Sequence, residues 1–208
     1  PQSTYVLSAA KNFFDKGFST ARVTLPDHGD AALLNKEMVP ITRNTFLCGS
    51  VEQICNLDPS LPVGLIGFSM GGNCALRIAR NLPKAPIPQV CHVVAVSPVI
   101  EPEETCTLID RSPLIRRYFL SKFDKLYRQK QAQFPEYRSA NDLLEQKTLH
   151  DLTKLSVLRW SEFSSAEMYF SAYKIRKGDF AQTNVPVTLL TAKDDPIVSV
   201  NSARALDD

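Results

Sequence analysis

Residues 61–80 read LPVGLIGFSMGGNCALRIAR and determine what fold we expect for the chain. The apolar run from Val63 to Gly67 is short enough to be a buried β-strand. After Gly71 the apolar residues recur at helical spacing, which indicates a helix. Ser69 lies between these two segments, inside the pattern G-x-S-x-G. The stretch therefore predicts a strand, a sharp turn at a serine, and a helix.

A serine at such a turn is well placed to act as a nucleophile. The strained turn exposes its hydroxyl at the carboxyl edge of the sheet, next to a helix N-terminus. Glycines two residues before and after it, Gly67 and Gly71, are expected because a Cβ atom would crowd the turn. The N–H of Met70 would point at the oxyanion of a tetrahedral intermediate. We interpret Ser69 as the nucleophile and Met70 as an oxyanion-hole donor, with an ordinary turn serine as the alternative.

A serine hydroxyl needs a base to take its proton and a carboxylate to orient that base. The apolar run 187–191 predicts a strand, and Asp194 and Asp195 follow at its carboxyl end. We choose Asp195 as the acid. Asp194 is the second choice for the acid, and is otherwise expected to fix the loop by hydrogen-bonding local backbone. An ordinary acidic turn is the alternative interpretation of this pair.

The sequence has three histidines, His28, His92 and His150, and all of them precede Asp195. With a nucleophile of this kind the acid follows the serine and the histidine comes last. We interpret His92 as a core residue of a strand and His28 as a brace of its loop. His150 belongs to a helical insertion. We therefore expect the catalytic histidine to lie beyond Asp208 in the intact protein.

The remaining pattern alternates apolar strands with helices, which is typical of a mostly parallel sheet covered on both faces. Helices are expected over 4–16 and about 46–56, and further strands over 21–25 and 90–96. The sequence thus predicts an α/β fold with a parallel sheet at its centre.

Residues 101–184 change to charged and aromatic composition with helical stretches, which predicts a helical cap inserted between strands. The core is then formed by residues 1–100 and 185–208, and both of its ends look incomplete. Basic residues in the cap are interpreted as a solvated helix face and not as a nucleic-acid site. They are Arg111, Arg116, Arg117, Lys122, Lys125, Arg128 and Lys130.

Six aromatic side chains of the cap have two possible roles: they line a pocket for apolar acyl groups, or they form the core of the cap itself. They are Phe119, Phe123, Tyr127, Tyr169, Phe170 and Tyr173.

The composition narrows the class of protein further. A formal net charge of +2 gives no broad field for nucleic acid or an anionic membrane. The apolar runs are strand-sized and far below the ~18 residues of a membrane span. Five cysteines without a CxxC pair indicate free buried thiols in a reducing compartment, so we expect a cytoplasmic protein.

Five segments resemble the α/β-hydrolase superfamily and, within it, the YheT-like branch of hydrolases. They are LPDHGDAALLN (25–35), GFSMGGNCALRIA (67–79), AVSPVIEP (95–102), AQFPEY (132–137) and TAKDDPIVS (191–199). The resemblance implies an eight-stranded sheet, a helical cap and hydrolysis of carboxylic esters, with Ser69 as nucleophile and Asp195 or Asp194 as acid. It implies a small-molecule ester as substrate, and neither a metal nor an organic cofactor.

Two features of that family are missing from this sequence. A His-Gly-rich oxyanion loop does not precede the first helix, and a Gly-His pair does not follow the DDP loop. A catalytically silent scaffold that serves as a binding module is therefore a second hypothesis. An acyltransferase or amidase that uses the same triad is a third, because one set of residues can serve many acyl substrates.

Overall fold

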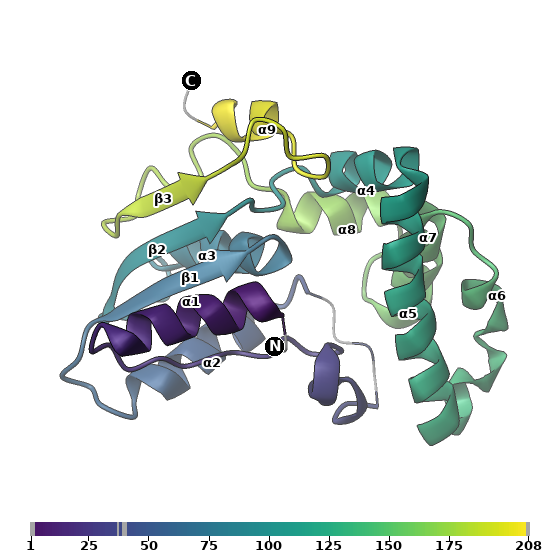
Figure 1. Ribbon diagram of the computed structural model, residues 1–208, viewed down its shortest axis with the longest axis horizontal. Helices are drawn as coiled ribbons and strands as arrows, with labels where there is room; N and C mark the ends of the chain where they lie inside the picture. The colour runs from purple at the N-terminus through teal and green to yellow at the C-terminus, as the bar shows by residue number, and fades with distance from the viewer. Residues whose placement is uncertain (1–2, 37, 39–40, 207–208) are drawn as a thin grey trace.

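The computed structural model describes residues 3–36, 38 and 41–206. The described residues form a parallel sheet of three strands in the order β1 (Val63–Phe68), β2 (Val90–Val96) and β3 (Val187–Leu190). All three strands were expected from their apolar runs. Because the strands are parallel, their carboxyl ends meet at one edge, and in Figure 1 this edge points toward the helices of the cap.

Two helices cover one face of the sheet, α2 (Asn44–Cys55) and α3 (Met70–Asn81). Ala79 of α3 and Val93 of β2 are both fully buried in the apolar cluster between the layers. α3 follows β1 directly, so its small residues can pack closely on the neighbouring strand β2. This layer places the start of α3 at the carboxyl edge of the sheet.

On the other face of the sheet lies α1 (Thr4–Asp15), as Figure 1 shows. It contacts β1 through the ring of Tyr5, whose centroid lies 5.2 Å from that of Phe68. Ile66, on the same face of β1, remains 41% exposed, so the cover is thinner here than under α3. Helices on both faces of a parallel sheet confirm the predicted fold class.

The expected strand at residues 21–25 is not formed. The segment is extended and carries no strand assignment, although its alternation of polar and branched residues is typical of a strand. Among the described residues β1 pairs with β2 and β2 pairs with β3, and no strand forms a ladder with residues 21–25. The eight strands implied by the resemblance are likewise not seen, since the described residues contain three.

Residues 101–184, here called the cap, contain helices throughout. They are α4 (Pro102–Arg111), α5 (Pro113–Gln133), a 3-10 helix (Pro135–Ser139), α6 (Asn141–Leu144), α7 (Leu149–Trp160) and α8 (Ala166–Tyr173). Two short helices in the remainder are a 3-10 helix (Gly29–Leu33) and α9 (Val200–Arg204). No helix among the described residues is both long and apolar enough to span a membrane. The division into a core and a cap stays a prediction, and its ends at 1–2 and 207–208 lie outside the described residues.

The cap has an apolar core of its own. Tyr127, Phe170 and Tyr173 are each at most 3% exposed, and Phe119, Phe123 and Tyr169 pack against the same cluster. Burial raises the pKa of Tyr127 to about 12, and its hydroxyl lies 2.5 Å from Ser156 Oγ. The alternative that these aromatic rings form the core of the cap is confirmed for the three buried ones.

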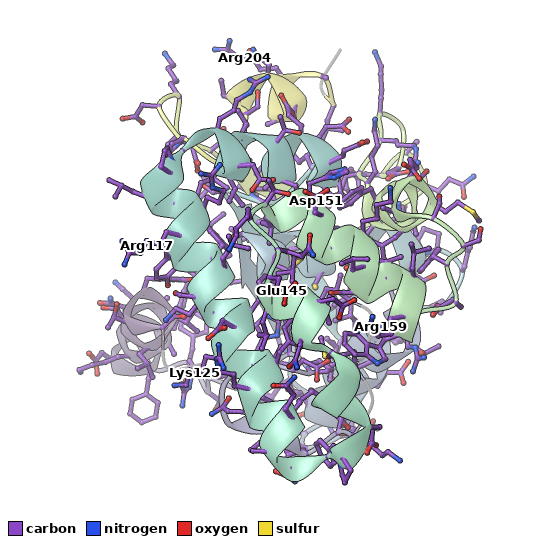
Figure 2. The ribbon with its side chains drawn as sticks, turned by 90° about the vertical axis from the view of Figure 1, so that its right-hand side faces the viewer. Arg117, Lys125, Glu145, Asp151, Arg159 and Arg204 are labelled. Atoms are coloured by element: carbon purple, nitrogen blue, oxygen red, sulfur yellow. The ribbon has the colours of Figure 1, made fainter. Side chains whose placement is uncertain are left out.

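The basic residues of α5 fall into two groups. Figure 2 shows Arg117 and Lys125 on the outer side of the helix, directed away from the cap core, as expected for a solvated face. Lys130 is different, because its side chain is fully buried. Its Nζ lies 2.8 Å from Asp27 Oδ1 and donates to Asn35 O at 2.8 Å. The solvated-face interpretation is therefore wrong for Lys130, which joins the cap to the loop after residue 25.

The five cysteines are free thiols, as expected from their spacing. Four of them are buried, and burial raises the pKa of Cys106 to about 12. Cys91, at the register shift where β2 begins, is exposed, so the expectation of five buried thiols is wrong at this position.

Replacing Lys130 with Met should lower the free energy of unfolding by roughly 3–5 kcal/mol, because the Asp27 carboxylate stays buried and loses this cation. Lys125→Met is the matched control on the exposed side of the same helix, with an expected change of about 0.5 kcal/mol or less. Urea denaturation followed by circular dichroism measures both. Equal effects of the two substitutions would contradict the assignment.

Candidate active site

The turn at Ser69 has the strained geometry that its sequence predicts. Ser69 has φ 51° and ψ −117°, which L-residues rarely adopt, and the residue is exposed. A Cβ at Gly67 would lie 2.1 Å from the carbonyl oxygen of Gly71, so only glycine fits there. A Cβ at Gly72 would come within 3.0 Å of the Pro98 side chain. A Cβ at Gly71 would meet nothing within 4 Å, so the expected crowding is wrong for that glycine.

The helix that begins at the turn offers a backbone donor next to the serine. Asn73 N donates to Ser69 O at 3.1 Å, so the hydrogen-bond ladder of α3 begins at the serine itself. Met70 is the first residue of α3, where an N–H group has no acceptor within its own helix. The positive end of the helix dipole lies at the same point. This geometry suits the predicted oxyanion-hole role of Met70, which stays a prediction.

The register of the sheet aligns the ends of the three strands. Phe68 pairs with Val96, and Val96 pairs with Leu190. One residue further on, Ser69 N donates to Val96 O at 2.9 Å and Ser97 N donates to Leu190 O at 2.7 Å. With strands ~4.8 Å apart, the ends of β1 and β3 are separated by about 10 Å. A histidine ring placed across the end of β2 can bridge that gap.

The loop after β3 presents the two predicted carboxylates. Asp195 is half-buried, and its Oδ1 accepts hydrogen bonds from the backbone N–H groups of Ile197 and Val198, both at 2.9 Å. Asp194 is exposed. The loop-fixing role expected for Asp194 therefore belongs to Asp195. These bonds hold the Asp195 carboxylate in one orientation and use only one of its two oxygens, which leaves Oδ2 for a histidine.

Both loops of this edge face the cap. Met70, which follows the serine, packs against the apolar cluster of the cap, and so does Ile197, which follows the acid. A substrate that reaches Ser69 therefore lies between the edge of the sheet and the cap.

The three histidines are engaged elsewhere. His28 Nδ1 lies 2.7 Å from Pro26 O, which confirms its role as a brace of the loop. His92 lies near the amino end of β2 with Nε2 2.9 Å from Thr188 Oγ1, so it is hydrogen-bonded within the sheet as expected, but it is half-buried and not the core residue that was predicted. The ring of His150 packs on Phe170 of the cap at 5.9 Å. None of the three forms a described contact with Ser69 or Asp195.

Among the described residues, no group of three or more His, Cys, Asp or Glu side chains is arranged to hold a metal ion.

Comparison with known protein families gives one match, to the family described as serine aminopeptidase, S33, over residues 47–208. The match includes β1, the elbow at Ser69, the whole cap and the loop with Asp195. The chain belongs to this family of α/β-hydrolases. Searches of curated proteins and of solved structures gave no match.

Family membership makes the chain a hydrolase and supports a serine hydrolase. The superfamily inferred from the resemblance is confirmed, whereas the YheT-like branch is not tested by this match and stays a prediction.

Two structural features beside Ser69 were not expected from the sequence. Ser97 has φ 41° at the end of β2, and Val99 N donates to Ser69 O at 3.3 Å, so the segment 97–99 supports the elbow from the side. Asn73 is fully buried directly beneath the elbow. The recurrence of Asn73, Arg77 and Arg80 at helical spacing was the available signal for Asn73, while the support from Val99 depends on tertiary contact.

Replacing Gly67 with Ala should destabilise the hydrolase by about 2 kcal/mol or more, because the new methyl group collides with the backbone of residue 71. Gly71→Ala is the matched control: its methyl group meets open space, and alanine in a helix gains roughly 0.5–1 kcal/mol over glycine. Thermal melting of the two variants measures the difference. A Gly67→Ala protein as stable as the unmodified one would contradict the observed approach of the two backbones.

Proposed function

We propose that this protein is a serine hydrolase that cleaves carboxylic esters of small molecules. The observation that supports the proposal most directly is the exposed, strained Ser69 at the carboxyl edge of the sheet, in the same edge as the oriented Asp195 carboxylate. Membership of a hydrolase family agrees with it.

In the proposed reaction, the Ser69 hydroxyl attacks the acyl carbon while a histidine takes its proton. The C–O bond of the ester then breaks, and the histidine returns the proton to the leaving alcohol. Asp195 orients the histidine through Oδ2, and the Met70 N–H stabilises the oxyanion of the intermediate. A water molecule then attacks the acyl group on Ser69 in the same way, and the carboxylic acid and the free Ser69 hydroxyl are released.

The base in this proposal is a histidine outside residues 1–208. The three histidines within these residues contact Pro26, Thr188 and Phe170, and none forms a described contact with Ser69 or Asp195. The order serine, acid, histidine is the one that accompanies this type of nucleophile elbow.

Amide hydrolysis is a second candidate, and the description of the family as serine aminopeptidases favours it. The same nucleophile and acid serve both reactions, so substrates decide between them. An intact protein that cleaves aminoacyl p-nitroanilides faster than p-nitrophenyl esters would replace the ester assignment. Acyl transfer by the same triad remains a variant in which an alcohol or amine takes the place of water.

A catalytically silent binding module is the third candidate, and the placement of the three histidines favours it. It predicts that the intact protein binds a ligand at the carboxyl edge without reacting with it. We also propose a cytoplasmic location, because the five cysteines are free thiols. A nucleic-acid partner is not proposed, because a formal net charge of +2 gives no broad positive field.

The intact protein should react with a fluorophosphonate probe at Ser69, because the probe forms a stable bond with an activated serine. Ser69→Ala should abolish labelling, while Ser121→Ala, on the exposed side of α5, should leave it unchanged. Peptide mass spectrometry locates the modified residue. Unlabelled intact protein beside reactive control enzymes would refute the enzyme proposal and favour the binding module.

Asp195→Asn should keep the fold of the loop, because an amide oxygen can still accept from Ile197 and Val198. It should lower kcat for p-nitrophenyl butyrate by roughly 10³–10⁴-fold, because the histidine loses the acceptor that orients it. Asp194→Asn is the control, with an expected change of less than about threefold. If Asp194→Asn carries the larger loss, the acid is Asp194 and the present choice is wrong.

A further inference from the structure

One face of α3 holds two segments that flank the helices of the cap, one before α4 and one after α8. We call these segments the neck; they are residues 97–101 and 173–176. They run side by side, since Ile175 N donates to Ile100 O at 3.1 Å. Figure 1 shows α8 ending close to the start of α3, where the second segment of the neck begins.

Asn73 makes the central contact with the neck. Its Nδ2 donates to Val99 O and to Tyr173 O, both at 2.7 Å, so one amide group holds both segments. Its Oδ1 accepts from Arg77 Nε at 2.9 Å. Both N–H donors of the amide are therefore used, and the residue is fully buried.

Arg77 and Arg80 continue this contact along the helix, because residues at spacings of three and four lie on one helix face. Arg77 is fully buried and donates to Asn44 Oδ1 at 3.0 Å and to the Ile41 carbonyl, which fixes it to the start of α2. Arg80 donates to Lys174 O at 3.2 Å. Asn73 and Arg80 thus hold the neck on α3, and Arg77 fixes the same helix to the start of α2.

The same contacts reach the nucleophile itself. The carbonyl oxygen of Ser69 accepts from Asn73 N at 3.1 Å and from Val99 N at 3.3 Å. The serine, the first turn of α3 and the first segment of the neck therefore form one connected unit. A shift of the neck moves the cap relative to the nucleophile.

We propose that Asn73 is a positioning residue that fixes the neck of the cap to the nucleophile helix and thereby sets how much room the cap leaves above Ser69. Through this position it selects the size of the acyl group that the site accepts. The first statement stands on the contacts alone, whereas the second rests on the proposed function.

Asn73→Asp tests the first statement with almost no change of shape. The variant keeps an oxygen for Arg77 but replaces the donor of both neck contacts with an oxygen that faces two carbonyl groups. Amide hydrogen exchange at Val99 and Ile175 should become about 10-fold faster or more, while exchange in α5 and α7 stays unchanged. Asn81→Asp is the control, because it places the same charge on the same helix where the side chain contacts Cys48 and not the neck.

Exchange that is unchanged at the neck would overturn the proposal. Exchange that rises equally in the neck, α3 and α5 would overturn it too, because Asn73 would then contribute general stability. If Asn73→Asp does not fold, Arg80→Ala removes the contact with Lys174 from a half-buried position. It should speed exchange at Ile175 and not at Val99, and an unaltered Ile175 would overturn the proposal.

Acyl selectivity tests the second statement. The ratio of kcat/KM for p-nitrophenyl decanoate to that for the butyrate should change about fivefold or more in Asn73→Asp, through KM rather than kcat, and stay constant in Asn81→Asp. If Asn73→Asp changes hydrogen exchange at the neck but leaves the ratio of the two kcat/KM values constant, the proposed role in acyl selectivity is refuted. If the unmodified intact protein fails to react with the fluorophosphonate, the proposed function fails, and the exchange experiment still decides whether Asn73 holds the neck.

Discussion

The backbone of residue 67 approaches the carbonyl of residue 71 so closely that no side chain fits between them, and the rest of the site depends on this contact. It forces the chain to reverse within the few residues between β1 and α3. The strain of that reversal is taken up at Ser69, whose positive φ turns its side chain out of the sheet. The exposed position of Ser69 is therefore a consequence of close packing between a strand and the helix that follows it.

The parallel register extends this local constraint across the sheet. Because Ser69 N and Ser97 N each bond to the strand beside them, the ends of β1, β2 and β3 are held in line. The acid loop begins from the third strand and is fixed by Asp195 itself. The spacing of the strands therefore sets the separation between Ser69 and the loop with Asp195.

The cap is attached to the rest of the chain by polar contacts in which both partners are buried. Asn73 holds the neck from α3, and Lys130 meets Asp27 at the far end of α5. Buried polar groups are costly unless they are satisfied, so such contacts favour one arrangement of the cap over many. The apolar core holds the helices of the cap together, and these few polar contacts fix the position of the cap relative to the sheet.

Residue type and spacing alone were enough to predict the three strands, the elbow and the helical nature of residues 101–184, because each depends on neighbours close in sequence. Apolar runs and periodicity report burial directly. Asp195 could be placed after a strand for the same reason. The sequence also separated His28 and His92 from the site, since their surroundings in the chain already indicated structural roles.

Other features depend on partners that are distant in the chain. Residues 21–25 have the composition of a strand, but a strand forms only beside another strand. Lys130 looks like its exposed neighbours on α5, and only the approach of Asp27, more than a hundred residues earlier, explains its burial. The contacts of Asn73 likewise join carbonyls on segments that meet only in the folded state. The sequence by itself determined the strand, the turn at Ser69 and the helix that follows, because these are local, whereas the tertiary structure decided which polar groups are buried together, because burial requires a partner that only folding brings into reach.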